Sequence, residues 1–211
     1  MKPRFKDPVS GFSHLVGLGL AIAGVSWLVA RHFAGGRPDT ALCIYGGSLI
    51  ALYAASSAYH LVVAGERTTR ALRALDHLAI FLLVAGTCTP VFCTAFDGAA
   101  RIVMLSVVWG AAFLGVALRL TWRSAPRVVY TTLYVAMGWM LVVRWPDVLR
   151  ALPTTALILI VAGGAAYTLG AVVYAIRRPN PFPRFFGFHE IWHLFVLGGS
   201  ALHFAAVASL R

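Results

Sequence analysis

Two histidines near the C-terminal end of the sequence have a spacing that can hold a metal ion. The segment HEIWH places His189 and His193 four residues apart. In an α-helix this interval puts both imidazoles on one face, about 6 Å apart along the axis. Catalytic zinc commonly takes three protein ligands and leaves a fourth position for water. A third ligand must therefore come from another part of the chain.

His60, in the segment SSAYH, is predicted to be that third ligand. Ser56 precedes it by four residues, so the hydroxyl shares the helical face of His60, one turn deeper. Asp76 is one of two acids at or inside an apolar stretch, where ionisable groups are costly and usually functional. Asp76 is predicted to hold and deprotonate the zinc-bound water, or to orient a ligand.

Each of these residues also has a plainer interpretation. A lone histidine at a helix end is more often a packing residue than a ligand, and Ser56 could simply pack or bond to the helix backbone. Glu190 follows His189 directly, about 100° around the helix, so we expect it to face away from the ion and to interact with the helix N-terminus. His77 is expected to be a helix-end packing residue, and His203 a packing or polar-contact residue.

The elements that must position these residues are predicted to be membrane spans. The 211 residues are 60% hydrophobic and 12% charged, whereas a soluble domain carries roughly 25% charged residues. A span needs about 20 apolar residues, and stretches of that length use most of the chain. We therefore predict an all-α membrane protein whose residues 1–211 form a single seven-helix bundle. The predicted spans are about 11–31, 41–63, 76–96, 101–121, 127–145, 154–176 and 189–209, with Trp145, Pro146 and Pro153 blurring the boundary between the fifth and sixth.

The placement of basic residues predicts how the bundle crosses the membrane. Of the 18 lysines and arginines, 12 lie in one set of alternate loops and 6 in the other, and basic residues mark cytoplasmic loops. This bias predicts a cytoplasmic N-terminus and an external C-terminus. His60, Asp76 and His189 then share one depth near the cytoplasmic face, whereas His203 lies about 15 Å beyond His193. The net charge of +11 resides in short loops, which argues against a nucleic-acid partner.

Four segments resemble the hemolysin III family, the bacterial branch of the progestin and adipoQ receptor superfamily. They are DPVSGFSHLVG, SSAYH, LDHLAIFLLVAGTCTP and FHEIWHLFVLGGSALHF. The resemblance implies a multi-pass protein of the bacterial inner membrane with a zinc ion, Zn²⁺, held by His60, His189 and His193. It also implies that Asp76 partners the zinc-bound water and that Ser56 is an accessory polar group. The superfamily is similar to the alkaline ceramidases, which hydrolyse a lipid amide at such a site.

Three functions are compatible with these residues. The first is a zinc-dependent hydrolase that cleaves an amide or related bond of a membrane lipid, with Asp76 accepting the proton of a water whose pKa zinc lowers to about 7. The second is a pore-forming or membrane-disrupting haemolysin. The third is a ligand receptor or sensor in which zinc is structural. The polar residues gather at one end of the spans rather than along a path, which favours the hydrolase.

Overall fold

The computed structural model describes residues 5–33, 39–122, 124–183 and 185–210. Within these ranges seven helical segments are long and apolar enough to cross a membrane, and the described residues contain no named strand. Four of them come first: α1 (Pro8–Arg31), α2 (Thr40–Leu61), α3 (Glu66–Ala95) and α4 (Gly98–Thr121). The fifth segment, Arg127–Ala151, is built from α5 (Arg127–Gly138), a 3-10 turn (Met140–Arg144) and α6 (Trp145–Ala151), and α7 (Thr154–Ile176) and α8 (Phe188–Ser209) follow. The predicted all-α bundle of seven spans is confirmed.

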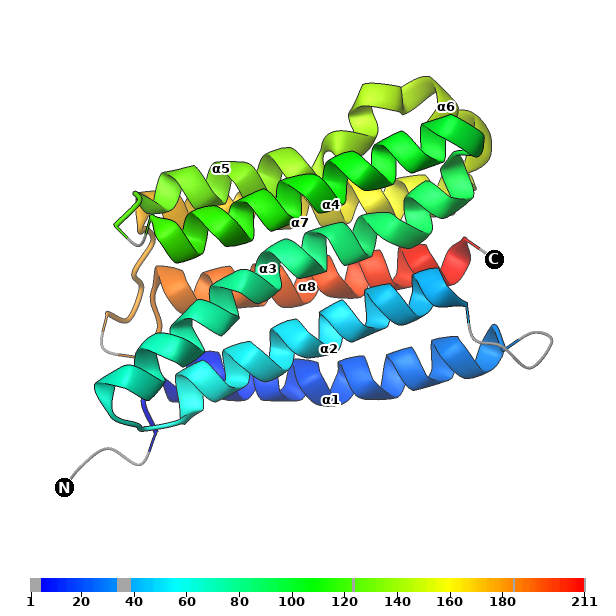
Figure 1. Ribbon diagram of the computed structural model, residues 1–211. Coiled ribbons are helices and arrows are strands. Elements are labelled where there is room, and N and C mark those ends of the chain that lie inside the picture. The colour runs from blue at the N-terminus through cyan, green and yellow to red at the C-terminus, as the bar shows by residue number, and fades with distance from the viewer. Residues whose placement is uncertain (1–4, 34–38, 123, 184, 211) are drawn as a thin grey trace.

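The helices run up and down, and the two chain ends lie at opposite ends of the bundle (Figure 1). Neighbours in sequence pack together, and α8 closes the bundle by packing against both α7 and α1. The start of α8 therefore lies at the same end of the bundle as the start of α1. We call this the N-terminal end of the bundle. It also holds the end of α2 (Figure 1).

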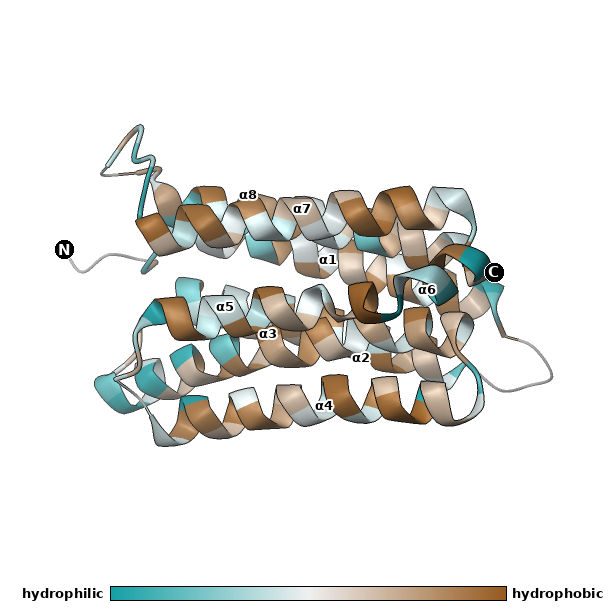
Figure 2. Cartoon of the chain, turned by 90° about the horizontal axis from the view of Figure 1, so that it is seen from above, coloured by the Kyte–Doolittle hydropathy of each residue, from teal (hydrophilic) through white to brown (hydrophobic). Residues whose placement is uncertain are grey.

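The outer surface of the bundle is apolar, as lipid contact requires. Leu20, Ile102 and Ile158 each expose more than 60% of their surface, which would be unfavourable in water but matches hydrocarbon. Hydrophilic residues gather toward helix ends and connecting loops (Figure 2). With lipid outside, burying apolar groups does little to hold helices together, so close packing by small residues becomes important.

Two helices differ from the predicted spans. Helix α3 begins at Glu66 rather than at Asp76, because the segment ERTTRALRAL contains good helix formers that are too polar for a hydropathy window. Asp76 therefore lies about three turns inside the helix instead of opening it. The helix is a continuous one that passes through Pro90.

The fifth span is interrupted rather than straight. Helix α5 ends at Gly138, a poor helix former, and the chain continues as a 3-10 turn into α6, which has Pro146 in its first turn. Proline has no N–H to continue a helix across this point. Trp139 lies at the break and donates its indole N–H to Thr168 Oγ1 of α7 at 3.0 Å. The segment extends to Ala151, beyond the predicted end at residue 145.

Candidate metal centre

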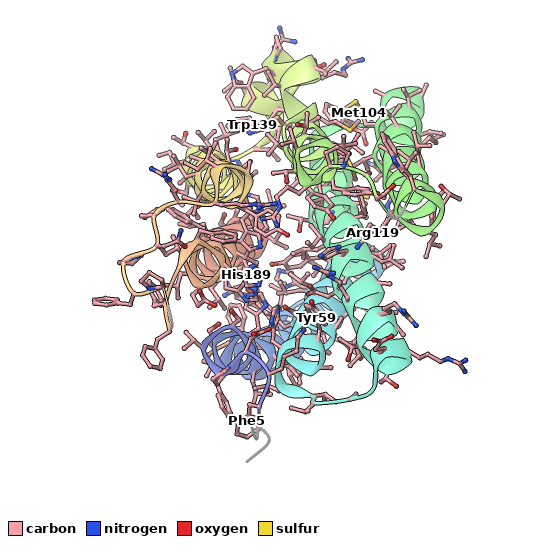
Figure 3. All side chains as sticks on the ribbon, turned by 90° about the vertical axis from the view of Figure 1, so that its left-hand side faces the viewer. Phe5, Tyr59, Met104, Arg119, Trp139 and His189 are labelled. Carbon is pink, nitrogen blue, oxygen red and sulfur yellow. The ribbon has the colours of Figure 1, made fainter. Side chains whose placement is uncertain are left out.

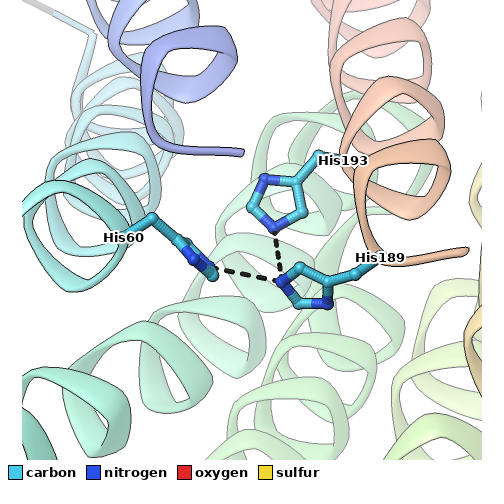
Figure 4. A group of neighbouring side chains, drawn as sticks. All are labelled: His60, His189 and His193. Atoms are coloured by element: carbon cyan, nitrogen blue, oxygen red, sulfur yellow. Dashed lines mark hydrogen bonds between the residues drawn. The ribbon is translucent and has the colours of Figure 1, made fainter. Parts of the chain in front are cut away.

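His60, His189 and His193 converge from two helices at the N-terminal end of the bundle (Figure 4). His60 is in the last turn of α2, and the other two are in the first two turns of α8. Both helices pack against α1, which brings residues 129 positions apart into contact. The view along the bundle shows His189 turned inward from α8 toward the end of α2 at Tyr59 (Figure 3).

The start of α8 is fixed by its own sequence. Gly187 is the N-cap, and the Glu190 carboxylate reaches back to accept the Gly187 N–H at 2.8 Å. This reach-back contact is half of a capping box and satisfies a backbone donor that the helix leaves unpaired. Glu190 also accepts the Ser10 hydroxyl of α1 at 3.1 Å. Glu190 is thus a helix-start acid turned away from the histidines, as expected.

The three imidazoles present their Nε2 atoms to one another. His189 Nε2 lies 3.4 Å from His60 Nε2 and 3.2 Å from His193 Nε2, and the three candidate ligand atoms all lie within 4.8 Å of one another. Tetrahedral zinc with Zn–N bonds of 2.0–2.1 Å separates two ligand nitrogens by about 3.3 Å. The two measured separations match that value. The donor set of three nitrogens also suits zinc better than an oxygen-preferring ion such as magnesium.

The burial of the histidine side chains strengthens the case for a bound metal cation. The side chains of His60 and His193 expose 2% and 3% of their surface. Three nitrogen atoms facing one small volume cannot all keep a proton, and lone pairs that face each other repel. A shared metal ion relieves that repulsion, so this structure fits the zinc site implied by the sequence.

Asp76 and Ser56 lie on the wall of a cavity that His189 and His193 also line. Both are buried, and the Ser56 side chain lies next to the Asp76 carboxylate. The adjacent Ser57 behaves differently, because it donates to Tyr53 O within its own helix at 2.6 Å. Ser56 thus differs from Ser57 in its surroundings, and its accessory role beside Asp76 stays a prediction. Asp76 is not one of the three converging side chains, which suits a group that acts beside the ion rather than on it.

The cavity continues from this polar end through the bundle. Its volume, as space open to the centres of water molecules, is about 150 Å³. The lining comes mainly from α2, α3, α5, α7 and α8, with His14 of α1 and Leu141 of the 3-10 turn. Along α3 it extends from Asp76 to Phe92. That interval corresponds to about 24 Å of helix, most of the roughly 30 Å hydrocarbon core of a bilayer. Beyond the metal centre the lining is mainly apolar.

The remaining histidines have other partners. His77 Nδ1 accepts from Arg119 Nε at 2.9 Å, and His203 Nε2 bonds to Ile160 O at 3.1 Å. The contact of His203 fits its predicted polar-contact role, whereas His77 makes a polar contact where helix-end packing was predicted. His14 is buried and its ring lies against that of His193, with centroids 3.9 Å apart. The contact between His14 and His193 was not predicted from the sequence.

Sequence reasoning missed one residue of the site. Asp7 was assigned to a loop, yet its Oδ2 lies 3.1 Å from His60 Nδ1. The hydrogen bond from His60 lowers the pKa of the Asp7 carboxyl below its ordinary value, against the opposing effect of partial burial. No spacing rule links residues 7 and 60, because they belong to different elements. The only sequence signal was that Asp7 begins the segment DPVSGFSHLVG.

Comparison with known proteins identifies the family of the chain. The model of the family described as "Haemolysin-III related" matches residues 3–204. The chain is 30% identical to the hemolysin-3 homolog of Bacillus subtilis, covering 96% of this chain and 92% of that protein. It is also 30% identical to hemolysin-3 of Bacillus cereus, over 96% of this chain and 90% of the relative. The human monocyte to macrophage differentiation factor is 28% identical over 78% of this chain and 67% of its own length. This integral, multi-pass membrane protein therefore belongs to the haemolysin-III related family.

Proposed function

We propose that this protein is a zinc-dependent intramembrane hydrolase that cleaves an amide or related acyl bond of a membrane lipid. The observation that carries the proposal is the convergence of three imidazoles, two of which, His189 and His193, line the polar end of a long, mainly apolar cavity. Such a substrate needs a reactive group at the polar end of the cavity and space for its acyl chain behind that group. The catalytic roles of Asp76 and Ser56 are part of the proposal.

The chemistry divides between the centre and the cavity. Zinc held by His60, His189 and His193 supplies a water of lowered pKa and a Lewis acid for the carbonyl oxygen. Asp76 accepts the proton of the attacking water and passes it to the departing amine, so that water and amide become carboxylic acid and amine. Ser56, which lies next to Asp76, would donate its hydroxyl hydrogen to the carboxylate and hold it in position.

The cavity determines which lipid can react. Its apolar walls exclude water from the acyl chain, and its length along α3, about 24 Å, is enough for one long chain. The carbonyl at the head of that chain would lie at the polar end, next to Asp76 and His189. Binding energy from the remote chain would then hold the reacting bond in place.

We also propose that the N-terminal end of the bundle faces the cytoplasm of a bacterial inner membrane. The support is the 12 to 6 distribution of basic residues between the two sets of loops. In a variant without the three native cysteines, Glu66→Cys should react with an impermeant maleimide only in inverted vesicles. Asp97→Cys, at the opposite end of α3, should react only in intact cells. The reverse pattern would place the metal centre on the outer side.

The hydrolase proposal is tested with purified protein in detergent, loaded with zinc and given a panel of long-chain N-acyl amides and esters. Fatty acid release, measured by mass spectrometry, is expected from wild type and from the control His32→Ala, which changes a histidine at the far end of α1. His60→Ala should release none. Equal turnover by His60→Ala would overturn the proposal.

Membrane disruption is the alternative that the name of the Bacillus cereus relative suggests. Leakage of a dye from liposomes distinguishes the two, because a pore does not need the histidines. Leakage that persists in His60→Ala would favour disruption. If instead wild type binds zinc, melts at lower temperature after chelation, and cleaves no member of the panel, then a receptor with structural zinc becomes the better assignment.

A further inference from the structure

The segment before α1 is attached to the last turn of α2. The Asp7 N–H donates to His60 O at 2.9 Å, and Lys6 Nζ lies 3.4 Å from both Tyr59 O and the centroid of the Tyr59 ring. Carbonyls in the last turn of a helix have no partner within the helix. Asp7 and Lys6 supply those partners, which holds the Asp7 side chain beside the His60 ring.

The contact between the Asp7 carboxylate and the His60 ring determines which ring nitrogen carries a proton. An ionised carboxylate can only accept hydrogen bonds, so the 3.1 Å contact requires a proton on His60 Nδ1. A neutral imidazole protonated at Nδ1 has its lone pair at Nε2. That atom is the one facing His189 Nε2 at 3.4 Å. Asp7 therefore selects the form of His60 that can bind a metal.

The usual role of an aspartate at this position does not account for the contact. Asp7 is the N-cap residue of α1, but its side chain makes no capping hydrogen bond. The carboxylate bonds to His60 instead. Among the described residues, His60 is also the only one of the three candidate ligands whose ring lies within ion-pair distance of a carboxylate.

We propose that Asp7 is a positioning residue of the metal centre, which holds His60 in the tautomer and orientation needed to bind the ion. The inference rests on the metal site of the proposed function but not on hydrolysis. Carboxylate partners of metal-bound histidines commonly raise metal affinity, and their loss typically weakens binding by about 10- to 100-fold. Because coupling is reciprocal, bound zinc should also hold the N-terminal segment more firmly on α2.

The test measures the zinc dissociation constant of purified protein by competition with a chelator of known affinity. Asp7→Asn should bind zinc about 10- to 100-fold more weakly than wild type, because an amide is neutral and can present its NH₂ group to Nδ1. Asp7→Glu, which keeps the carboxylate, should recover part of the affinity. Glu66→Gln is the matched control, since it removes an exposed carboxylate whose partner is Arg70. It should bind zinc as wild type does.

Two further readouts separate positioning from folding. The zinc-free forms of Asp7→Asn and wild type should melt at the same temperature, whereas a structural role would lower that of the variant. In wild type, zinc should slow hydrogen exchange at the Asp7 amide, and Asp7→Asn should reduce this effect. A zinc affinity for Asp7→Asn within about twofold of wild type would overturn the inference. If wild type binds no zinc, both this inference and the proposed function are overturned. If wild type binds zinc but hydrolyses no lipid, only the proposed function is overturned.

Discussion

His193 and His203 lie on the same helix, line the same cavity and differ in what their Nε2 atoms face. His203 Nε2 bonds to Ile160 O at 3.1 Å. A carbonyl can only accept, so that nitrogen carries a proton and has no lone pair for a metal. His193 Nε2 faces His189 Nε2 at 3.2 Å. The partner of each ring, not its depth in the membrane helix, therefore makes His193 a candidate ligand and His203 a packing residue.

His193 and His203 also lie in different surroundings. Ten residues along a helix turn the side chain by about 280° beyond two full turns, so the two rings leave α8 in different directions. His193 lies against His14 of α1, whereas His203 lies against α7, where a side chain on Gly163 would collide with it. One face of α8 is used for the centre and another for packing.

The largest expected effect is the loss of metal from one histidine variant and not from the other. His193→Ala removes one of three ligands and should reduce bound zinc from about one ion per chain to almost none, since catalytic zinc commonly has three protein ligands. His203→Ala should keep the zinc. Metal content of the purified proteins by mass spectrometry makes the comparison. Equal metal loss in both variants would contradict the division between the two faces of α8.

Asp76 should affect turnover without affecting metal content. Asp76→Asn keeps the size of the side chain but cannot accept a proton, so lipid hydrolysis should fall by about 10²- to 10⁴-fold, the usual contribution of a general base. Zinc content should stay at the wild-type level because the carboxylate is not among the converging ligands. Both quantities are measured on the same preparation. Zinc loss in Asp76→Asn would make Asp76 a ligand instead.

The contact between α7 and His203 of α8 should be sensitive to one added methyl group, which should lower the stability of the protein. Gly163→Ala places a Cβ inside the space of the His203 ring, whereas Gly164→Ala places one at 3.4 Å from Trp139, an ordinary contact. Overpacking of this kind typically costs about 1–3 kcal/mol. Thermal unfolding in detergent should show a lower melting temperature for Gly163→Ala alone, with zinc bound in both. Equal melting of the two variants would show that the α7–α8 contact adapts easily.

The parts of this structure that follow local rules were predictable from the sequence. The seven spans follow from hydropathy, and the His189 and His193 pair follows from helix geometry. His60 could be added because alternating spans bring particular ends to one depth. Asp7 could not be found in this way, because its contact with His60 depends on how the segment before α1 folds onto α2.

The ends and interruptions of the helices were also not fully predictable from the sequence. Hydropathy identifies the part of α3 that suits lipid, but the helix begins at Glu66 because polar residues can form helix beyond the membrane. The interruption after Gly138 is stabilised by a contact between Trp139 and Thr168 on α7. Contacts of this kind are tertiary, and a single sequence does not display them.

The smallest expected effect distinguishes two neighbouring serines of α2. Ser56 lies next to the Asp76 carboxylate and is proposed to donate a hydrogen bond to it, whereas Ser57 bonds to Tyr53 O of its own helix. A single hydrogen bond contributes about 0.5–1.5 kcal/mol net, so Ser56→Ala should slow lipid hydrolysis by about two- to tenfold. Ser57→Ala should leave the rate unchanged, because Tyr53 O also takes part in the helix ladder. The measurement is the initial rate of lipid hydrolysis by each variant at equal zinc occupancy. If the Ser57→Ala variant is slower than the Ser56→Ala variant, Ser56 does not support Asp76.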